Sequence, residues 1–382
     1  MPFFQEPLPL SLYVHIPWCV RKCPYCDFNS HEAKSALPES IYVEALMQEI
    51  DQHLPDIANR SLVSIFFGGG TPSLFSEKAI ADILNGAASR IPFSDQIEIT
   101  LEANPGTLDE ARFRGFRAAG VNRLSIGIQS LHDTHLKSLG RIHDRERAMA
   151  AIHAAKSAGF TRFNLDFMYA LPHQSIEEAL HDLKTAIEFE PAHLSWYQLT
   201  IEPNTLFHHA PPPQPLEDEM WEMQQAGQQL LQQAGYRQYE VSAYALSGQE
   251  CIHNKNYWEF GDYLGIGAGA HSKLTNVKTQ QVKRFSQVKN PRDYLDGAKR
   301  KAIEMKIIDD NALIFEFMLN ALRLTHGVSA DLFSNRTGLS LWRIQPILND
   351  ARARGLLIDD EKIICPTALG FQYLNDVMQL FL

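Results

Sequence analysis

The sequence lacks any uninterrupted apolar run of the roughly 18–20 residues that a membrane-spanning helix needs. Its first 19 residues also lack the basic segment and long apolar stretch of a secretory leader. Cysteine is scarce, with five residues among 382, an odd number that does not suit a disulfide framework. These absences predict a cytoplasmic protein with reduced thiols and no transmembrane segment.

Positive charge is also in short supply. The formal net charge is -10 at pH 7 and the isoelectric point is about 5.8. Nonspecific binding to nucleic acid needs a basic face, so the composition predicts no nucleic-acid partner. The hydrophobic fraction of 45% is typical of a globular chain that can bury a large core.

Strand-like and helix-like segments alternate through the first half of the chain. The strand-like runs are rich in β-branched and aromatic residues and end in Gly, Pro, Asn or Ser. They occupy residues 10–16, 62–67, 96–105, 122–130, 161–172 and 193–203. Helical segments with Ser or Thr caps and Gly stops lie between them, for example after Thr107 and after Ser175. The alternation predicts parallel βα units, wound as an open sheet or a barrel.

The pattern changes after Pro203, which suggests three parts. A proline-rich connector at 208–215 leads to a helix at 217–235 and then to an irregular aromatic stretch. From about Asp310 we expect helices, including one over 339–355, then a hairpin and a last helix, an order that resembles a winged-helix module. The expected division is 1–205 for the barrel core, 206–305 for an extension, and 306–382 for the C-terminal α+β module.

Three of the five cysteines lie together directly after the first strand, in the spacing C-x3-C-x2-C. They are Cys19, Cys23 and Cys26. Ligands of βα folds gather at the C-terminal ends of the strands, so this is a favourable place for a metal site. Thiolates at this spacing suit either zinc, with His31 as a fourth ligand, or an iron–sulfur cluster with one iron left open.

The context of the cysteines resembles the radical S-adenosylmethionine (SAM) superfamily. Tyr25 precedes the third cysteine, and "GGGTP" at 68–72 follows the second strand. The resemblance implies a partial (βα)6 TIM-like barrel in which the three cysteines bind a 4Fe-4S cluster and SAM chelates the open iron. It further implies that SAM contacts a set of residues at successive strand ends: Tyr13, Tyr25, Gly69, Gly70, Thr71, Glu102, Gln129, Arg141 and Asp166.

Longer motifs resemble one branch of that superfamily, the oxygen-independent coproporphyrinogen III oxidases and the heme chaperones related to them. These motifs are "YVHIPWCVRKCPYCDFNS", "FFGGGTPS", "EANPGT", "GVNRLSIGIQS" and "LGRIHD". Two departures separate this chain from the oxidases. Phe28 stands where they have a fourth cysteine, and only 12 residues precede Tyr13, where they have a long extension.

The segment "HNKNYW" at 253–258 is similar to the H-N-x-x-Y-W element of the chaperone branch. Imidazole is a common axial ligand of heme iron, and aromatic rings offer flat surface to a macrocycle. The resemblance therefore implies that His253 binds heme, with Cys251 and His271 as alternatives. A simple core role for this segment is the competing interpretation.

The sequence thus predicts a heme chaperone with three cofactors: a 4Fe-4S cluster, SAM and heme. It would pass heme to heme-requiring apoproteins, such as membrane-bound respiratory proteins, with at most peripheral contact with the inner membrane. Whether it has enzyme activity, and whether it forms a homodimer, stay open. The alternative function is oxidative decarboxylation of coproporphyrinogen III.

Overall fold

The computed structural model describes residues 2–57, 59–107, 109–300 and 303–382. Six parallel strands form the centre of the fold, in the order in which they occur along the chain. They are β1 (Leu10–Ile16), β4 (Leu62–Gly69), β5 (Phe93–Ala103), β6 (Arg123–Gln129), β7 (Phe163–Tyr169) and β8 (His193–Gln198). Each is close to a strand predicted from composition, because apolar side chains of these runs are buried.

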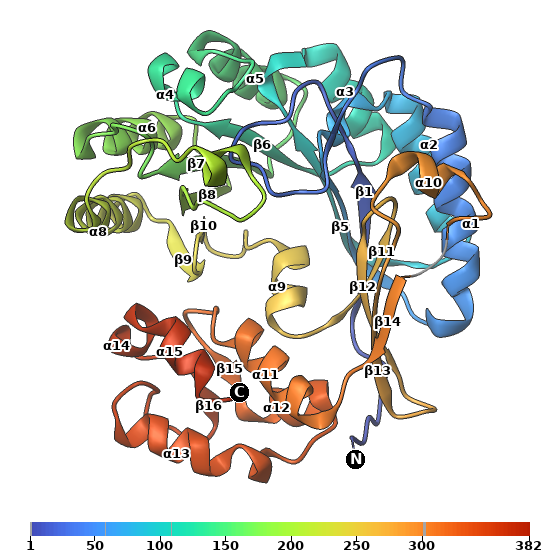
Figure 1. Cartoon of the computed structure of the whole chain (residues 1–382), viewed down its shortest axis with the longest axis vertical. Coiled ribbons are helices and arrows are strands. Elements are labelled where there is room, and N and C mark those ends of the chain that lie inside the picture. The colour runs from blue at the N-terminus through green and yellow to red at the C-terminus, as the bar shows by residue number, and fades with distance from the viewer. Residues whose placement is uncertain (1, 58, 108, 301–302) are drawn as a thin grey trace.

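Helices cover the outer face of these strands (Figure 1). They are α1 (Glu39–Ile57), α2 (Glu77–Ala88), α3 (Glu110–Ala119), α4 (Asp133–Ser138), α5 (Arg145–Ser157), α6 (Ile176–Glu188) and α8 (Glu217–Gln233). Ser175 caps α6 in a full capping box with Glu178, as its sequence indicates. The Thr cap expected for α3 is wrong. That helix begins after Asp109, whose carboxylate accepts the N–H of Arg112 at 2.9 Å.

The βα barrel is open, which confirms the predicted partial (βα)6 architecture. Twelve strands of the described residues form one sheet in the order β14-β13-β12-β11-β1-β4-β5-β6-β7-β8-β10-β9. The added strands are β9 (Arg237–Glu240), β10 (Ala243–Ala245), β11 (Asp262–Ile266), β12 (His271–Asn276), β13 (Gln281–Ser286) and β14 (Ile303–Ile307). Because β11 pairs with β1 and β10 pairs with β8, both edges of the barrel are extended instead of joined.

The short helix α9 (Ile252–Trp258) connects the two added groups of strands and packs against β4. In Figure 1 it lies between the barrel and the C-terminal module. Helices α7 (Leu206–His209) and α10 (Pro291–Leu295) and the pair β2 (Trp18–Cys19) and β3 (His31–Glu32) complete this part. No helix of the described residues is long and apolar enough to cross a membrane.

The C-terminal module consists of short helices and a small antiparallel pair. Its elements are α11 (Asp310–Ala321), β15 (Val328–Ser329), α12 (Ala330–Thr337), α13 (Gln345–Ala353), β16 (Ile363–Ile364), α14 (Ala368–Gln372) and α15 (Leu374–Gln379). The single helix expected over 339–355 is wrong. A 3-10 turn (Leu341–Arg343) precedes α13, because Pro346 in the first turn of α13 supplies no N–H to bond back to the preceding turn.

The module shares its apolar core with the rest of the chain. Phe317 and Phe333 pack in the same cluster as Phe260, Tyr239 and Phe4. The rings of Phe260 and Phe317 meet edge to face at 5.8 Å. This packing holds the module beside the open side of the barrel (Figure 1), and Arg323 of the module lines the cavity described next.

Candidate functional site

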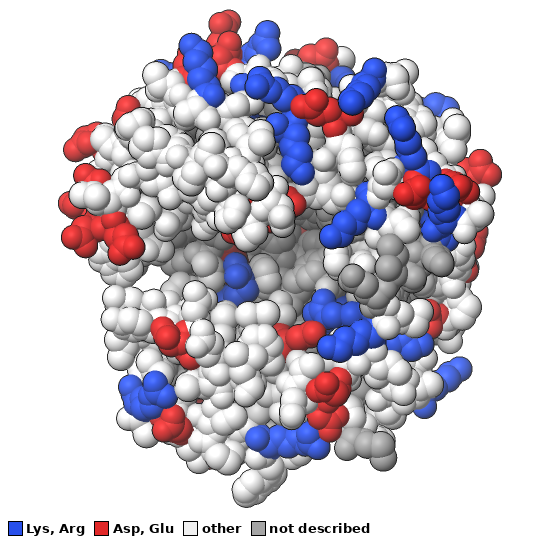
Figure 2. Space-filling view, viewed as in Figure 1, with Lys and Arg blue, Asp and Glu red and all other residues white. Residues whose placement is uncertain are grey.

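A cavity of about 420 Å³ opens at the C-terminal ends of the parallel strands. Figure 2 shows this face hollowed between the barrel and the C-terminal module, with acidic and basic side chains mixed around it. Eleven of the predicted site residues line it: Cys19, Cys23, Tyr25, Cys26, Gly69, Gly70, Thr71, Glu102, Gln129, Arg141 and Asp166. Tyr13 and His253 lie outside this lining. Tyr13 instead lines a neighbouring cavity, together with Gly69, Glu102 and His271.

The loop that carries the cysteines is closed by a short parallel pair, β2 and β3. The N–H of Ala33 donates to the carbonyl of Cys19 at 2.9 Å, and the N–H of Cys26 donates to that of Cys23 at 3.1 Å. All three thiols are free. Burial raises the pKa of Cys19 and Cys26, so a metal or another positive charge is needed to hold them as thiolates.

The sulfur spacing distinguishes the two metal interpretations. Tetrahedral zinc with bonds of about 2.3 Å needs sulfur atoms about 3.8 Å apart. Within the described ranges, the three ligands whose atoms lie within 4.8 Å of one another belong to His132, His181 and Asp182, and the cysteine sulfurs are not that close together. His31, the proposed fourth zinc ligand, bonds through Nε2 to Oδ1 of Asn29 at 3.2 Å. The three sulfurs therefore do not stand at the spacing of a preformed zinc site.

The glycine turn after β4 fixes the start of the cysteine loop. Gly70 donates its N–H to Ile16 O, and Thr71 donates to Trp18 O, both at 2.8 Å. A Cβ on Gly70 would come within 2.5 Å of the Trp18 carbonyl oxygen, and Gly69 has a φ of +114°. The glycines thus allow the turn to approach the chain's own backbone, in addition to leaving room in the cavity.

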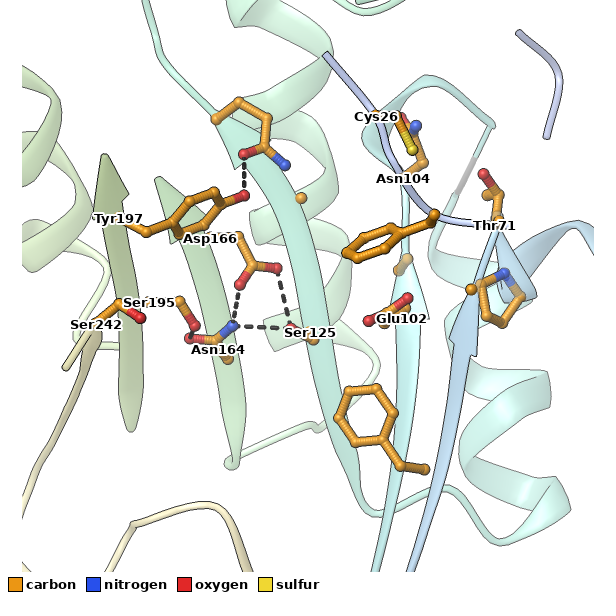
Figure 3. A pocket seen from close by; sticks show the side chains of 18 of the residues that line it. Cys26, Thr71, Glu102, Asn104, Ser125, Asn164, Asp166, Ser195, Tyr197 and Ser242 are labelled. Atoms are coloured by element: carbon orange, nitrogen blue, oxygen red, sulfur yellow. Dashed lines mark hydrogen bonds between the residues drawn. The ribbon is translucent and has the colours of Figure 1, made fainter. Parts of the chain in front are cut away.

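Two carboxylates face the cavity from β5 and β7, the strands on either side of β6 (Figure 3). Asp166 on β7 accepts hydrogen bonds from Ser125 at 3.0 Å and Asn164 at 2.7 Å. Burial raises the pKa of Asp166, and burial together with the charge of Asp166 raises the pKa of Glu102 to about 8. A cationic ligand between them would relieve this repulsion. SAM, which carries a sulfonium and an ammonium group, has that charge.

Gln129 and Arg141 complete the rim. Gln129 adopts a φ of +69° at the end of β6 and accepts the hydroxyl of Tyr197 at 2.7 Å. Arg141 donates to Gly127 O at 2.9 Å and lies 3.7 Å from the sulfur of Cys23, while its buried Nε has no acceptor among the described residues. The rim therefore offers a free donor next to the cysteine loop.

The sequence-based prediction missed several polar residues of the inner wall. They include Asn104, Arg123, Ser125, Asn164, His193, Ser195, Tyr197 and Ser242. A signal was present, because Ser125 and Gly127 on β6, and Asn164 and Asp166 on β7, alternate with buried apolar residues and so share the inward face. Polar residues on the inward face of a strand mark the interior of a site and not its rim alone.

Helix α9 presents two different faces to its surroundings. Asn254 and Trp258 line the main cavity. His253 is buried, bonds through Nδ1 to Ser64 Oγ at 2.9 Å, and stacks on Phe66 at 5.0 Å. Burial lowers the pKa of His253 to about 3, so the imidazole is neutral, and its Nε2 has no partner among the described residues.

The two alternatives to His253 have different surroundings. Cys251 is buried and its thiol donates to Glu98 at 3.4 Å. His271 is exposed and lines the neighbouring cavity with Tyr13 and Tyr257. A neutral imidazole with one free nitrogen is the form that ligates iron, so His253 retains the chemistry of a ligand in spite of its burial.

Comparison with known proteins agrees with this geometry. Residues 13–186 match the Radical SAM superfamily, and residues 308–373 match the HemN C-terminal domain. The fold resembles that of Escherichia coli coproporphyrinogen III oxidase (HemN), with a TM-score of 0.80, 24% identity, and coverage of 98% of this chain and 90% of that one. The fold and the cysteine site thus define a radical SAM protein, a class whose cofactors are a 4Fe-4S cluster and SAM.

Full-length relatives narrow the class further. The chain is 49% identical to the heme chaperone HemW of Haemophilus influenzae and 47% identical to that of E. coli, over 98% of each chain. It is 34% identical to the heme chaperone HemW of Bacillus subtilis, over 97% of this chain and 99% of that protein. The protein belongs to the HemW family.

Proposed function

We propose that this protein is a heme chaperone, which binds heme and passes it to heme-requiring apoproteins. The observation that carries the proposal is the position of α9. This helix, with the sequence of the predicted heme element, places Asn254 and Trp258 in the same cavity as the three cysteines. The names of the full-length relatives support the same function.

In this proposal Cys19, Cys23 and Cys26 hold the cluster. SAM lies against the strand ends, where Glu102 and Asp166 meet its positive charge. The remaining predicted contacts are Tyr13, Tyr25, Gly69, Gly70, Thr71, Gln129 and Arg141. The bound pair of cofactors would supply one-electron chemistry at the rim. The chain's own residues bind and orient the cofactors, and Arg141 places a positive charge beside Cys23.

Heme would be held through Nε2 of His253. The bond from Nδ1 to Ser64 fixes the orientation of the ring and leaves Nε2 as the free nitrogen. Phe66 stacks on the imidazole and itself lines the cavity. A macrocycle in the cavity therefore reaches His253 only after Phe66 or α9 moves, which couples heme uptake to a local opening of this helix.

Phe28 supports a chaperone over an oxidase. It stands where the oxidase pattern has a fourth cysteine, and its exposed ring lines the cavity close to the cluster-binding loop. An aromatic ring at that place adds apolar surface for a flat ligand. The recipients, peripheral contact with a membrane, a homodimer and the three-part division of the chain all remain predictions.

The test uses the full chain with its cluster reconstituted without oxygen. Hemin titration is expected to give a saturable complex, and anaerobic incubation with coproporphyrinogen, SAM and a reductant is expected to release no carbon dioxide. Decarboxylation under these conditions would contradict the chaperone and support the oxidase.

A further inference from the structure

Three buried N–H groups on residues that line the main cavity have no acceptor in the part of the chain that the structure describes. They are Nη2 of Arg123, Nε1 of Trp258 and Nε of Arg323. They come from three parts of the fold: β6 of the barrel, helix α9, and the segment between α11 and β15. A buried donor without an acceptor is costly, and three on residues that line one cavity indicate a ligand rich in acceptor atoms.

Arg123 is 3% exposed, and its surroundings leave it underpaired. Its carboxylate partner, Glu98, lies 3.8 Å from Nε but is shared with Arg162 at 2.9 Å, so one carboxylate serves two guanidinium groups. Asp166 also lies close enough to raise the pKa of Arg123. Its hydrogen bonds, however, go to Ser125 and Asn164.

Arg323 is held in position from two sides. It stacks over the Trp258 ring at 4.3 Å and donates Nη2 to Glu240 at 3.1 Å. The ring contact and the ion pair with Glu240 hold the guanidinium from two directions. Its Nε has no acceptor among the described residues, and Arg323, Trp258 and Glu240 all line the cavity.

From this geometry we infer that Arg123, Trp258 and Arg323 form a subsite for the carboxylates of a flat ligand. The guanidinium fork matches a carboxylate, and the indole ring beside it matches an aromatic plane. Resting on the proposed function, the inference assigns this subsite to the propionate groups of the porphyrin. The inference separates two contacts of the porphyrin: this subsite holds the propionates, and His253 ligates the iron.

The experiment titrates the full, cluster-loaded chain with iron-free protoporphyrin IX and with its dimethyl ester, in the same detergent solution. Porphyrin fluorescence reports binding, and the absence of iron removes the contribution of axial ligation. The free acid is expected to bind at least about tenfold more tightly than the ester, as a charge-assisted fork contact suggests.

Variants assign this preference to the subsite. Arg323→Gln is expected to lose most of the preference for the acid, and His253→Ala is expected to keep it. Arg343→Gln is the matched control, because Arg343 lies in the same module and pairs with Asp310 at 2.9 Å but does not line the cavity. Arg123→Gln is a second test, and its fold is checked by circular dichroism because the side chain is buried.

Equal binding of acid and ester by the wild type would overturn the inference and leave the proposed function standing. If both arginine variants keep the preference for the acid, the inference is likewise overturned and the proposed function is unaffected. Failure of the wild type to bind either hemin or porphyrin would instead overturn the proposed function, and the inference with it.

Discussion

The guanidinium of Arg141 lies 3.7 Å from the sulfur of Cys23, although 118 positions separate the two residues. The contact joins the loop between β2 and β3 to the loop between α4 and α5 across the mouth of the barrel. It places a fixed positive charge beside a thiol that a metal cluster requires as thiolate. In this pair one loop supplies a cluster ligand and another supplies the charge beside it.

Replacement of Arg141 by Gln is expected to lower cluster retention severalfold, since the fixed positive charge beside a cluster-binding sulfur is lost. Iron and sulfide are measured per chain after anaerobic reconstitution and gel filtration. Arg147→Gln, at an exposed arginine of α5, is the control and should retain the wild-type content. Equal content in both variants would show that the contact is incidental.

Replacement of His253 by Ala is expected to weaken hemin binding and to change the Soret band of the remaining complex, because the free Nε2 of a neutral imidazole is lost. The Soret band during titration is the measurement. His271→Ala is the matched control, because that imidazole is exposed in the neighbouring cavity. Loss of hemin binding in His271→Ala, with His253→Ala unaffected, would transfer the ligand role to His271.

The raised pKa of Glu102, about 8 against an ordinary 4.5, predicts a pH-dependent stability of the cofactor-free chain. Between these values the folded state binds more protons than the unfolded state, so stability falls as pH rises through this window and levels off above it. This pKa shift limits the pH-dependent change in the free energy of unfolding to about 5 kcal/mol. Glu102 is partly exposed in the cavity lining, and solvent screening reduces this to the order of 1–2 kcal/mol.

Chemical unfolding at several pH values measures this effect. Glu102→Gln should flatten the decline between pH 6.5 and 8, where the buried His253 has already lost its proton. An unchanged slope in this variant would assign the dependence to another group, such as Glu49, whose pKa burial raises to about 7.

Replacement of Gly70 by Ala is expected to displace the cysteine loop, because the new Cβ would come within 2.5 Å of the Trp18 carbonyl oxygen. Overpacking of this kind costs about 1–3 kcal/mol. Thermal unfolding and cluster content are both expected to fall. Gly297→Ala is the control, since a Cβ there meets nothing within 4 Å. Wild-type cluster content in Gly70→Ala would contradict the positioning role of the turn.

The sequence predicted the parts of the site that follow from the order of strands and helices along the chain. Cys19, Glu102 and Gln129 each lie at or just after the end of a parallel strand, and parallel strands place these ends at one rim. Alternation of strand and helix was therefore enough to predict that they line a common cavity. The prediction is wrong for the cap of α3 and the break before α13, because the choice between nearby acceptors such as Asp109 and the effect of Pro346 decide them residue by residue.

The parts that the sequence did not predict depend on packing between distant segments. Which face of α9 meets the cavity follows from the contact of His253 with Ser64 and Phe66 on β4, and no local pattern encodes that contact. The place of Arg323 follows from the shared core that holds the C-terminal module against the barrel. Both require the assembled fold.

The central claim is tested most directly by heme transfer. The hemin-loaded chain, with its cluster intact, is mixed with a heme-requiring respiratory apoprotein, and the Soret shift is followed over time. A parallel sample contains apo-globin as a passive scavenger, which reports spontaneous dissociation. We predict that the transfer rate exceeds dissociation and rises with the concentration of the respiratory apoprotein. A rate equal to that of the scavenger at every concentration would contradict a chaperone.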